Sequence, residues 1–109
     1  MSLDIYVSHV RQVTCLHCGK VTGTEVVHTQ ESDGRSWYPF LESIGYYVPY
    51  DRRTEGNNWY GKDMELTPKQ AKELYQFLKD TEVYNNYELG GLVSRALLDG
   101  DTVVVNADW

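Results

Sequence analysis

The fold of this chain is decided near its start, where residues 3–14 have the sequence Leu-Asp-Ile-Tyr-Val-Ser-His-Val-Arg-Gln-Val-Thr. Leu3, Ile5 and Val7 recur at a spacing of two, which is typical of a half-buried strand, and the valines that follow keep the β-branched content high. A second β-rich run, Val-Thr-Gly-Thr-Glu-Val-Val-His-Thr, occupies residues 21–29. Because only a compact turn separates the two runs, the sequence predicts a β-hairpin whose first strand is long or bent.

The clearest helix signal lies farther along, at Thr67-Pro68-Lys69-Gln70. A threonine N-cap, a proline at the first helical position and a glutamine at N3 all mark the start of a helix. Apolar residues then follow at intervals of three and four, which places one buried stripe on a helix that ends near Asp80.

Two weaker patterns and a final strand complete the fold. Ser36 as N-cap and Gly45 just beyond the last apolar residue indicate a short helix, and another helical pattern closes at Gly100. Residues 102–105 form a last β-branched run. We therefore expect a single α+β domain over residues 1–109, in which a small antiparallel sheet, built from the N-terminal hairpin and the C-terminal strand, packs against two to three helices.

The chain is acidic, with 10 Lys and Arg against 16 Asp and Glu and a formal net charge of −6 over its 109 residues. Residues 80–109 hold six of these carboxylates and a single arginine, a net charge of −5. The sequence has no basic stripe that could neutralise phosphates, so direct binding to nucleic acid is not expected. An acidic surface instead suits a basic protein partner. The simpler alternative is that these charges only keep the surface solvated.

Membrane association is not expected either. No apolar run approaches the length of a membrane span, and the start of the chain lacks the basic and apolar regions of a signal peptide. These observations favour a cytoplasmic protein.

The sharpest chemical motif is Cys15-Leu16-His17-Cys18-Gly19-Lys20. Two cysteines three residues apart in a turn can hold one metal ion, and the glycine permits the positive φ angle that turns backbone N–H groups toward sulfur. Zinc is the candidate cofactor, with His28 as the candidate third ligand. Straight strands would place His9 roughly 20 Å from Cys15 and His28 farther still from Cys18, both at the open end of the hairpin. A complete site therefore needs a sharp bend, a carboxylate, or a second copy of the chain in a metal-linked dimer. The alternative is a turn that merely tolerates two reduced cysteines.

An aromatic stretch over residues 37–60 is the second unusual feature. Trp37, Phe40 and Tyr46 are expected in the core. The other large aromatic residues lie in an irregular, polar segment, and with two acidic residues of the C-terminal third they form the candidate partner-binding set: Tyr47, Tyr50, Trp59, Tyr60, Glu82 and Glu88. Tyrosine and tryptophan are enriched at binding hot spots. The alternative is that the segment folds back as a lid on a small core.

Enzymatic activity is not expected. Neither cysteine is placed beside a base, and the sequence contains no Gly-x-Ser-x-Gly elbow. A phosphate-binding loop with the pattern Gly-x-x-x-x-Gly-Lys-Ser/Thr is also absent.

Three short stretches resemble small proteins encoded by tailed phages and prophages: Met1-Ser2-Leu3-Asp4-Ile5-Tyr6-Val7, the Cys15–Cys18 turn, and Trp59-Tyr60-Gly61 before an amphipathic helix. This family has no established activity, so the resemblance implies a phage or mobile-element setting, in the host cytoplasm, and no catalytic residues. The function expected from the sequence is that of a non-enzymatic accessory protein that binds a host or phage protein. The alternative is a small zinc-stabilised module, and the oligomeric state stays open between the two.

Overall fold

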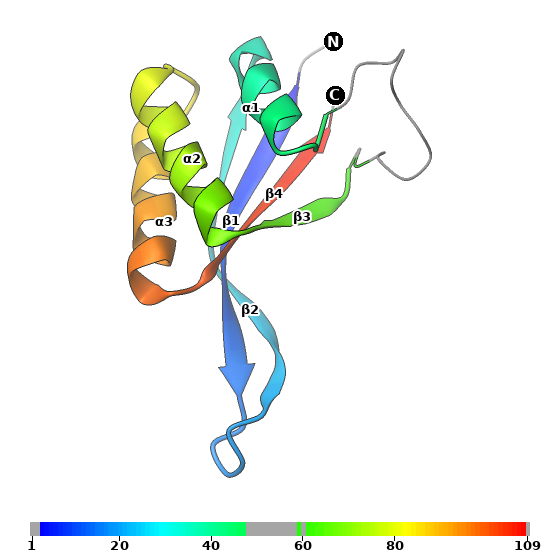
Figure 1. Ribbon diagram of the computed structural model, residues 1–109, viewed down its shortest axis with the longest axis vertical. Helices are drawn as coiled ribbons and strands as arrows, with labels where there is room; N and C mark the ends of the chain where they lie inside the picture. Colours follow the sequence, from blue (N-terminus) through cyan, green and yellow to red (C-terminus); the bar gives the residue numbers. More distant parts are fainter. Residues whose placement is uncertain (1–2, 48–58, 60, 109) are drawn as a thin grey trace.

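The computed structural model describes residues 3–47, 59 and 61–108. Within these residues the chain forms one layer of antiparallel sheet and one layer of helices (Figure 1), which confirms the expected α+β class. The strands lie in the order β2-β1-β4-β3 across the sheet. The elements follow one another as β1 (Asp4–Thr14), β2 (Val21–Asp33), the 3-10 turn η1 (Arg35–Trp37), α1 (Tyr38–Ser43), β3 (Asp63–Leu66), α2 (Pro68–Asp80), α3 (Asn86–Asp99) and β4 (Thr102–Asp108).

The predicted hairpin is present, and its second strand is longer than expected. Residues 30–33, beyond the predicted run of 21–29, continue β2 because they pair with Val7, Tyr6, Ile5 and Asp4 of β1. His9 pairs with His28 and Val10 pairs with Val26, so β2 has one extra residue at this bulge. The hairpin extends away from the helices (Figure 1), and the molecule measures 50 × 33 × 22 Å.

The first and last strands are neighbours in the sheet. β1 and β4 run antiparallel, with Ile5 opposite Ala107 and Val7 opposite Val105, so both ends of the described chain are held in the sheet. β3, which the sequence did not predict, adds a short edge strand through the pairing of Met64 with Val105 and Leu66 with Val103.

Residues adjacent in the sequence explain the start of α2 and the end of α3, but not the start of α1. Thr67 caps α2 with the full capping box, in which its hydroxyl accepts the Gln70 N–H and the Gln70 side chain accepts the Thr67 N–H. α3 ends before Gly100, whose φ of +70° is the left-handed conformation expected of a C-terminal glycine. Ser36, predicted as the N-cap of α1, lies within η1 instead, and α1 begins after Trp37 without a side-chain cap.

Removing the α2 cap gives the first prediction. Thr67→Ala removes the hydroxyl that accepts the Gln70 N–H, and we expect the free energy of unfolding to fall by about 1 kcal/mol. Urea denaturation of both proteins measures this difference, and Thr67→Ser, which keeps a capping hydroxyl, serves as the control. Equal midpoints for wild type and Thr67→Ala would contradict the prediction.

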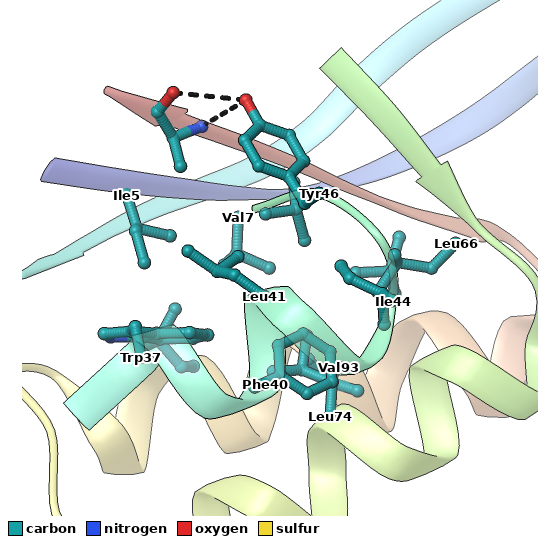
Figure 2. Close-up of a cluster of buried hydrophobic side chains, with 14 of the residues drawn as sticks. Ile5, Val7, Trp37, Phe40, Leu41, Ile44, Tyr46, Leu66, Leu74 and Val93 are labelled. Carbon is teal, nitrogen blue, oxygen red and sulfur yellow. Dashed lines mark hydrogen bonds between the residues drawn. The ribbon is translucent and has the colours of Figure 1, made fainter. Parts of the chain in front are cut away.

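The core lies between the helices and one face of the sheet. Figure 2 shows Ile5 and Val7 of β1 facing Leu41 of α1, with Leu74 of α2 and Val93 of α3 beneath them. Trp37, Phe40 and Tyr46 are buried, as the sequence predicts. Among the described residues, no helix has both the length and the apolar character needed to cross a membrane.

Candidate functional site

The sheet has a face that no described helix covers. Ile5 and Val7 of β1 are fully buried beneath the helices, whereas Tyr6 between them points the opposite way and is 43% exposed. Val103 and Val105 of β4 are buried in the same manner as Ile5 and Val7. We call the opposite side, on which Tyr6 lies, the open face.

Strand pairing arranges the open face in rows that run across the sheet. The first row consists of Asp33, Asp4 and Asp108, because Asp4 pairs with Asp33 on one side and with Asp108 on the other. The next rows are Glu31, Tyr6, Asn106 and Asp63; then Thr29, Ser8, Val104 and Glu65; then Val26, Val10 and Thr102.

These rows carry six carboxylates and no Lys or Arg. The only Lys or Arg in the four strands is Arg11, which turns to the other face and contacts Asp99 and Asp101. None of the six carboxylates forms an ion pair with a described residue. Like charges directly opposite one another destabilise a sheet. The row of three aspartates therefore costs the fold stability without a compensating contact among the described residues.

The open face is hollowed rather than flat. A concavity of about 960 Å³ has apolar side chains in its lining and carboxylates at the β3 side. The apolar residues on the strands are Tyr6, Val10, Val26, Met64 and Val104, and the carboxylates are those of Asp63 and Glu65. A hollow with an apolar centre and an acidic border can hold a side chain or segment that has an apolar body and a positive charge.

Of the predicted aromatic partner residues, the structure describes two. Trp59 is half-buried, lies with its ring centroid 6.3 Å from that of Tyr46, and also lines the hollow of the open face. Tyr47 is half-buried, with its ring centroid 4.7 Å from that of Tyr38. Both pack against the core, as the lid alternative requires. Tyr50 and Tyr60 lie outside the described residues.

The two predicted acidic partner residues lie elsewhere. Glu82 is exposed between α2 and α3, and Glu88 is exposed in the first turn of α3. Glu88 borders a shallow depression that includes Val27 and His28 of β2, whereas Trp59 lines the hollow beside β3. Because β2 and β3 are opposite edges of the sheet, the structure does not bring Glu88 and Trp59 together.

The predicted metal ligands are only partly assembled. Cys15 and Cys18 lie together in the turn at the tip of the hairpin. His28 pairs with His9 in the hairpin register, and its Nε2 lies 2.6 Å from the Gln30 side-chain nitrogen. Seven residues of strand separate His28 from Val21, roughly 20 Å at strand spacing. The structure therefore does not bring His28 to the cysteine pair.

A polar cluster around the buried His9 joins β1 to the end of α3 and the turn that follows it. His9 is 2% exposed, and its Nε2 lies 2.6 Å from Oδ2 of Asp101. Arg11 donates to the same Asp101 oxygen at 3.2 Å and to Asp99 at 3.3 Å. The bond to His9, together with Arg11, holds the pKa of the Asp101 carboxyl below its ordinary value.

Ligand atoms of His9, Asp99 and Asp101 all lie within 4.8 Å of one another, the only such group among the described residues. The Arg11 guanidinium already forms ion pairs with both carboxylates. The cluster therefore suits a structural clamp, which links β1 to the end of α3, better than a cation site. Sequence analysis missed this cluster because 92 positions separate His9 from Asp101, and no local pattern connects them.

Acid should weaken this clamp, which gives the second prediction. A carboxyl with a lowered folded-state pKa stabilises the fold above its unfolded pKa of about 3.9, and the contribution is lost as the pH falls through the folded-state pKa. We expect Asp101→Asn to be less stable than wild type at pH 7, and the difference to narrow below about pH 3.9. Urea midpoints measured from neutral to acidic pH test this, and a constant difference would contradict it.

Comparison with protein-family models, curated proteins and solved structures finds no match for this chain.

Proposed function

We propose that this protein is a non-enzymatic accessory protein of a phage or mobile element that binds a basic protein in the host cytoplasm through its open face. The observation that carries the proposal is the set of six carboxylates on that face, which lack any ion pair with a described residue. The phage setting rests on the sequence resemblance alone.

Charge complementarity points to a basic partner. Surface carboxylates without counter-charges create a negative potential that attracts and orients a positively charged surface. A bound basic protein would supply the missing counter-charges to the rows at Asp4 and Glu31. It would also relieve the repulsion between Asp33, Asp4 and Asp108, which the isolated chain leaves in place.

The apolar part of the hollow offers a partner surface to bury, which the charges alone do not provide. Tyr6 and Val26 are 43% and 63% exposed, and the half-buried Trp59 lines the same hollow. Burial of such groups mainly slows dissociation, whereas the surrounding carboxylates mainly speed association. A shared cation is a poorer explanation of the acidic rows, because no three of these carboxylates are among the described groups close enough to hold one.

Paired charge reversals test the location of the surface. Glu31→Lys/Glu65→Lys changes two exposed positions of the open face, and Glu82→Lys/Glu88→Lys changes the two helix-side residues indicated by the sequence. Both pairs alter the net charge equally. Immobilised wild-type protein should retain a basic protein from host lysate, and that protein is then purified for rate measurements at low and high salt.

We expect the open-face pair to lower the association rate by about tenfold or more at low salt, and the helix-side pair to change it far less. Thermal unfolding of both variants checks that the fold is intact. An equal loss in both variants would show that net charge alone matters. A loss confined to the helix-side pair would place the surface on the helices, and either result contradicts the proposal.

A further inference from the structure

The tip of the β1–β2 hairpin is a tight turn that contains Cys15 and Cys18. The Cys15 N–H donates to the Lys20 carbonyl and the Gly19 N–H donates to the Cys15 carbonyl, each at 2.8 Å. Gly19 has a φ of +70°, the left-handed conformation that permits this tight turn. The turn directs the backbone N–H groups of His17 and Cys18 at the Cys15 sulfur.

The cysteines lie next to each other in this turn, close enough for their side chains to interact. Neither cysteine is in a disulfide, and Cys18 is exposed. Two adjacent sulfurs with backbone N–H donors form half of the tetrahedral thiolate set that zinc prefers. A redox site of the thioredoxin kind would instead have its first cysteine at a helix N-terminus, whereas these cysteines lie between two strands.

The described part of the chain does not complete the set. The only described group of three or more close ligand side chains is His9, Asp99 and Asp101, which does not include the cysteine pair. His9 is held by Asp101, and His28 lies beside it about midway along the hairpin. Zinc at the tip therefore needs ligands from outside these residues.

The surroundings of the tip suit a second copy of the same tip. Leu16 is 99% exposed at the apex, and Val13 and Val21 at its base are 38% and 55% exposed. Residues 12–24 contain no carboxylate, and Lys20 is their only Lys or Arg, although the whole chain carries a net charge of −6. Two tips can thus meet without the repulsion that two acidic surfaces would suffer.

We propose that the hairpin tip is half of a zinc site, which two copies of this chain complete with the four sulfurs of Cys15 and Cys18. Each thiol releases its proton as its sulfur bonds to zinc, and no electron is transferred. The four thiolates exceed the charge of the zinc ion by two negative charges, which the two Lys20 ammonium groups of the dimer balance. The apolar side chains of Leu16 become covered by the partner. This dimer does not depend on the open face or on what binds there.

The test uses the full chain, purified under reducing conditions and supplied with zinc. We expect one zinc per two chains by elemental analysis, the mass of a dimer by light scattering, and return to a monomer when a chelator removes the metal. Cobalt in place of zinc should give the charge-transfer absorption of thiolate ligands. Cys15→Ser and Cys18→Ser should each lose the metal and the dimer, and keep the helical circular dichroism because the tip is remote from the core.

His17→Ala and His28→Ala are the matched controls, and both should keep the zinc and the dimer. Loss of zinc in either histidine variant would overturn the four-sulfur site. One zinc per monomeric chain would show that a single chain supplies every ligand. A reduced protein that binds no zinc and stays monomeric would also overturn the proposal. None of these results changes the expected effect of Glu31→Lys/Glu65→Lys on the basic partner, so the two proposals can fail separately.

Discussion

Trp37→Ala is expected to lower the free energy of unfolding by about 3–5 kcal/mol, the largest effect of any single change argued for this chain. Trp37 is fully buried, with its ring centroid 5.1 Å from that of Phe77 and 6.2 Å from that of Phe40. Truncation removes these contacts and leaves a cavity where α1 and α2 meet. Urea denaturation followed by circular dichroism measures the loss.

The indole N–H of Trp37 adds a polar link that packing alone does not describe. It donates to the Ser32 hydroxyl at 2.9 Å, and this hydroxyl donates to the Tyr84 carbonyl at 2.6 Å. Trp37→Phe keeps an aromatic ring but loses the N–H, so we expect a smaller loss than for Trp37→Ala. If both substitutions cost the same, the hydrogen bond rather than the packing would dominate at this site, contrary to the prediction.

The elements that sequence reasoning predicted are those whose causes are local. The capping box at Thr67 needs only four consecutive residues, and the end of α3 needs only Gly100. The hairpin has strong β-branched runs joined by a tight turn. In each case the structure is determined by residues that are neighbours along the chain, so the sequence pattern alone predicts it.

The elements that were missed depend on partners far along the chain. β3 is only four residues long, and it is a strand because Val103 and Val105 of β4 offer it hydrogen bonds and apolar neighbours. The extension of β2 to Asp33 likewise depends on the start of β1. A run of four alternating residues such as Asp63-Met64-Glu65-Leu66 is too short to be distinguished from a loop by its period alone.

The candidate site illustrates the same limit. The period of two places Asp4 and Tyr6 on one face of β1, but it does not say that Asp33 and Asp108 lie on either side of Asp4. A local charge count points to residues 80–109, whereas six carboxylates without an ion pair to a described residue lie together on the open face. The Cys15–Cys18 turn is local and was predicted; the ligands that complete a metal site there are not local to it.

Tyr46→Phe gives the second large effect, because it removes one hydroxyl that serves several backbone groups. Tyr46 is fully buried, donates to the Lys62 carbonyl at 2.6 Å and accepts the Ala107 N–H at 2.7 Å (dashed lines at the Tyr46 hydroxyl in Figure 2). Phenylalanine leaves these groups without that partner inside the protein. We expect the free energy of unfolding to fall by about 1–3 kcal/mol.

The pH dependence of this residue has a defined sign. Burial raises the pKa of the Tyr46 hydroxyl above its ordinary value of about 10. A raised folded-state pKa gives stability that is present below the unfolded pKa and is lost as the pH rises through the folded-state pKa. The stability difference between wild type and Tyr46→Phe should therefore narrow above about pH 10.

The local signature of Tyr46→Phe should appear at the edge of the sheet that carries Trp59. The Ala107 carbonyl accepts the Gly61 N–H at 2.8 Å, and the Tyr46 ring lies beside Trp59, so one hydroxyl anchors both the end of β4 and the approach to β3. Amide exchange at Ala107 should accelerate more than exchange at Leu74 in the middle of α2. Tyr6→Phe, which removes an exposed hydroxyl on the neighbouring strand, should change stability by less than about 0.5 kcal/mol. If the two tyrosine variants proved equally stable, the Tyr46 hydroxyl would not be the anchor of this edge, and the position of Trp59 on the open face would depend on ring packing alone.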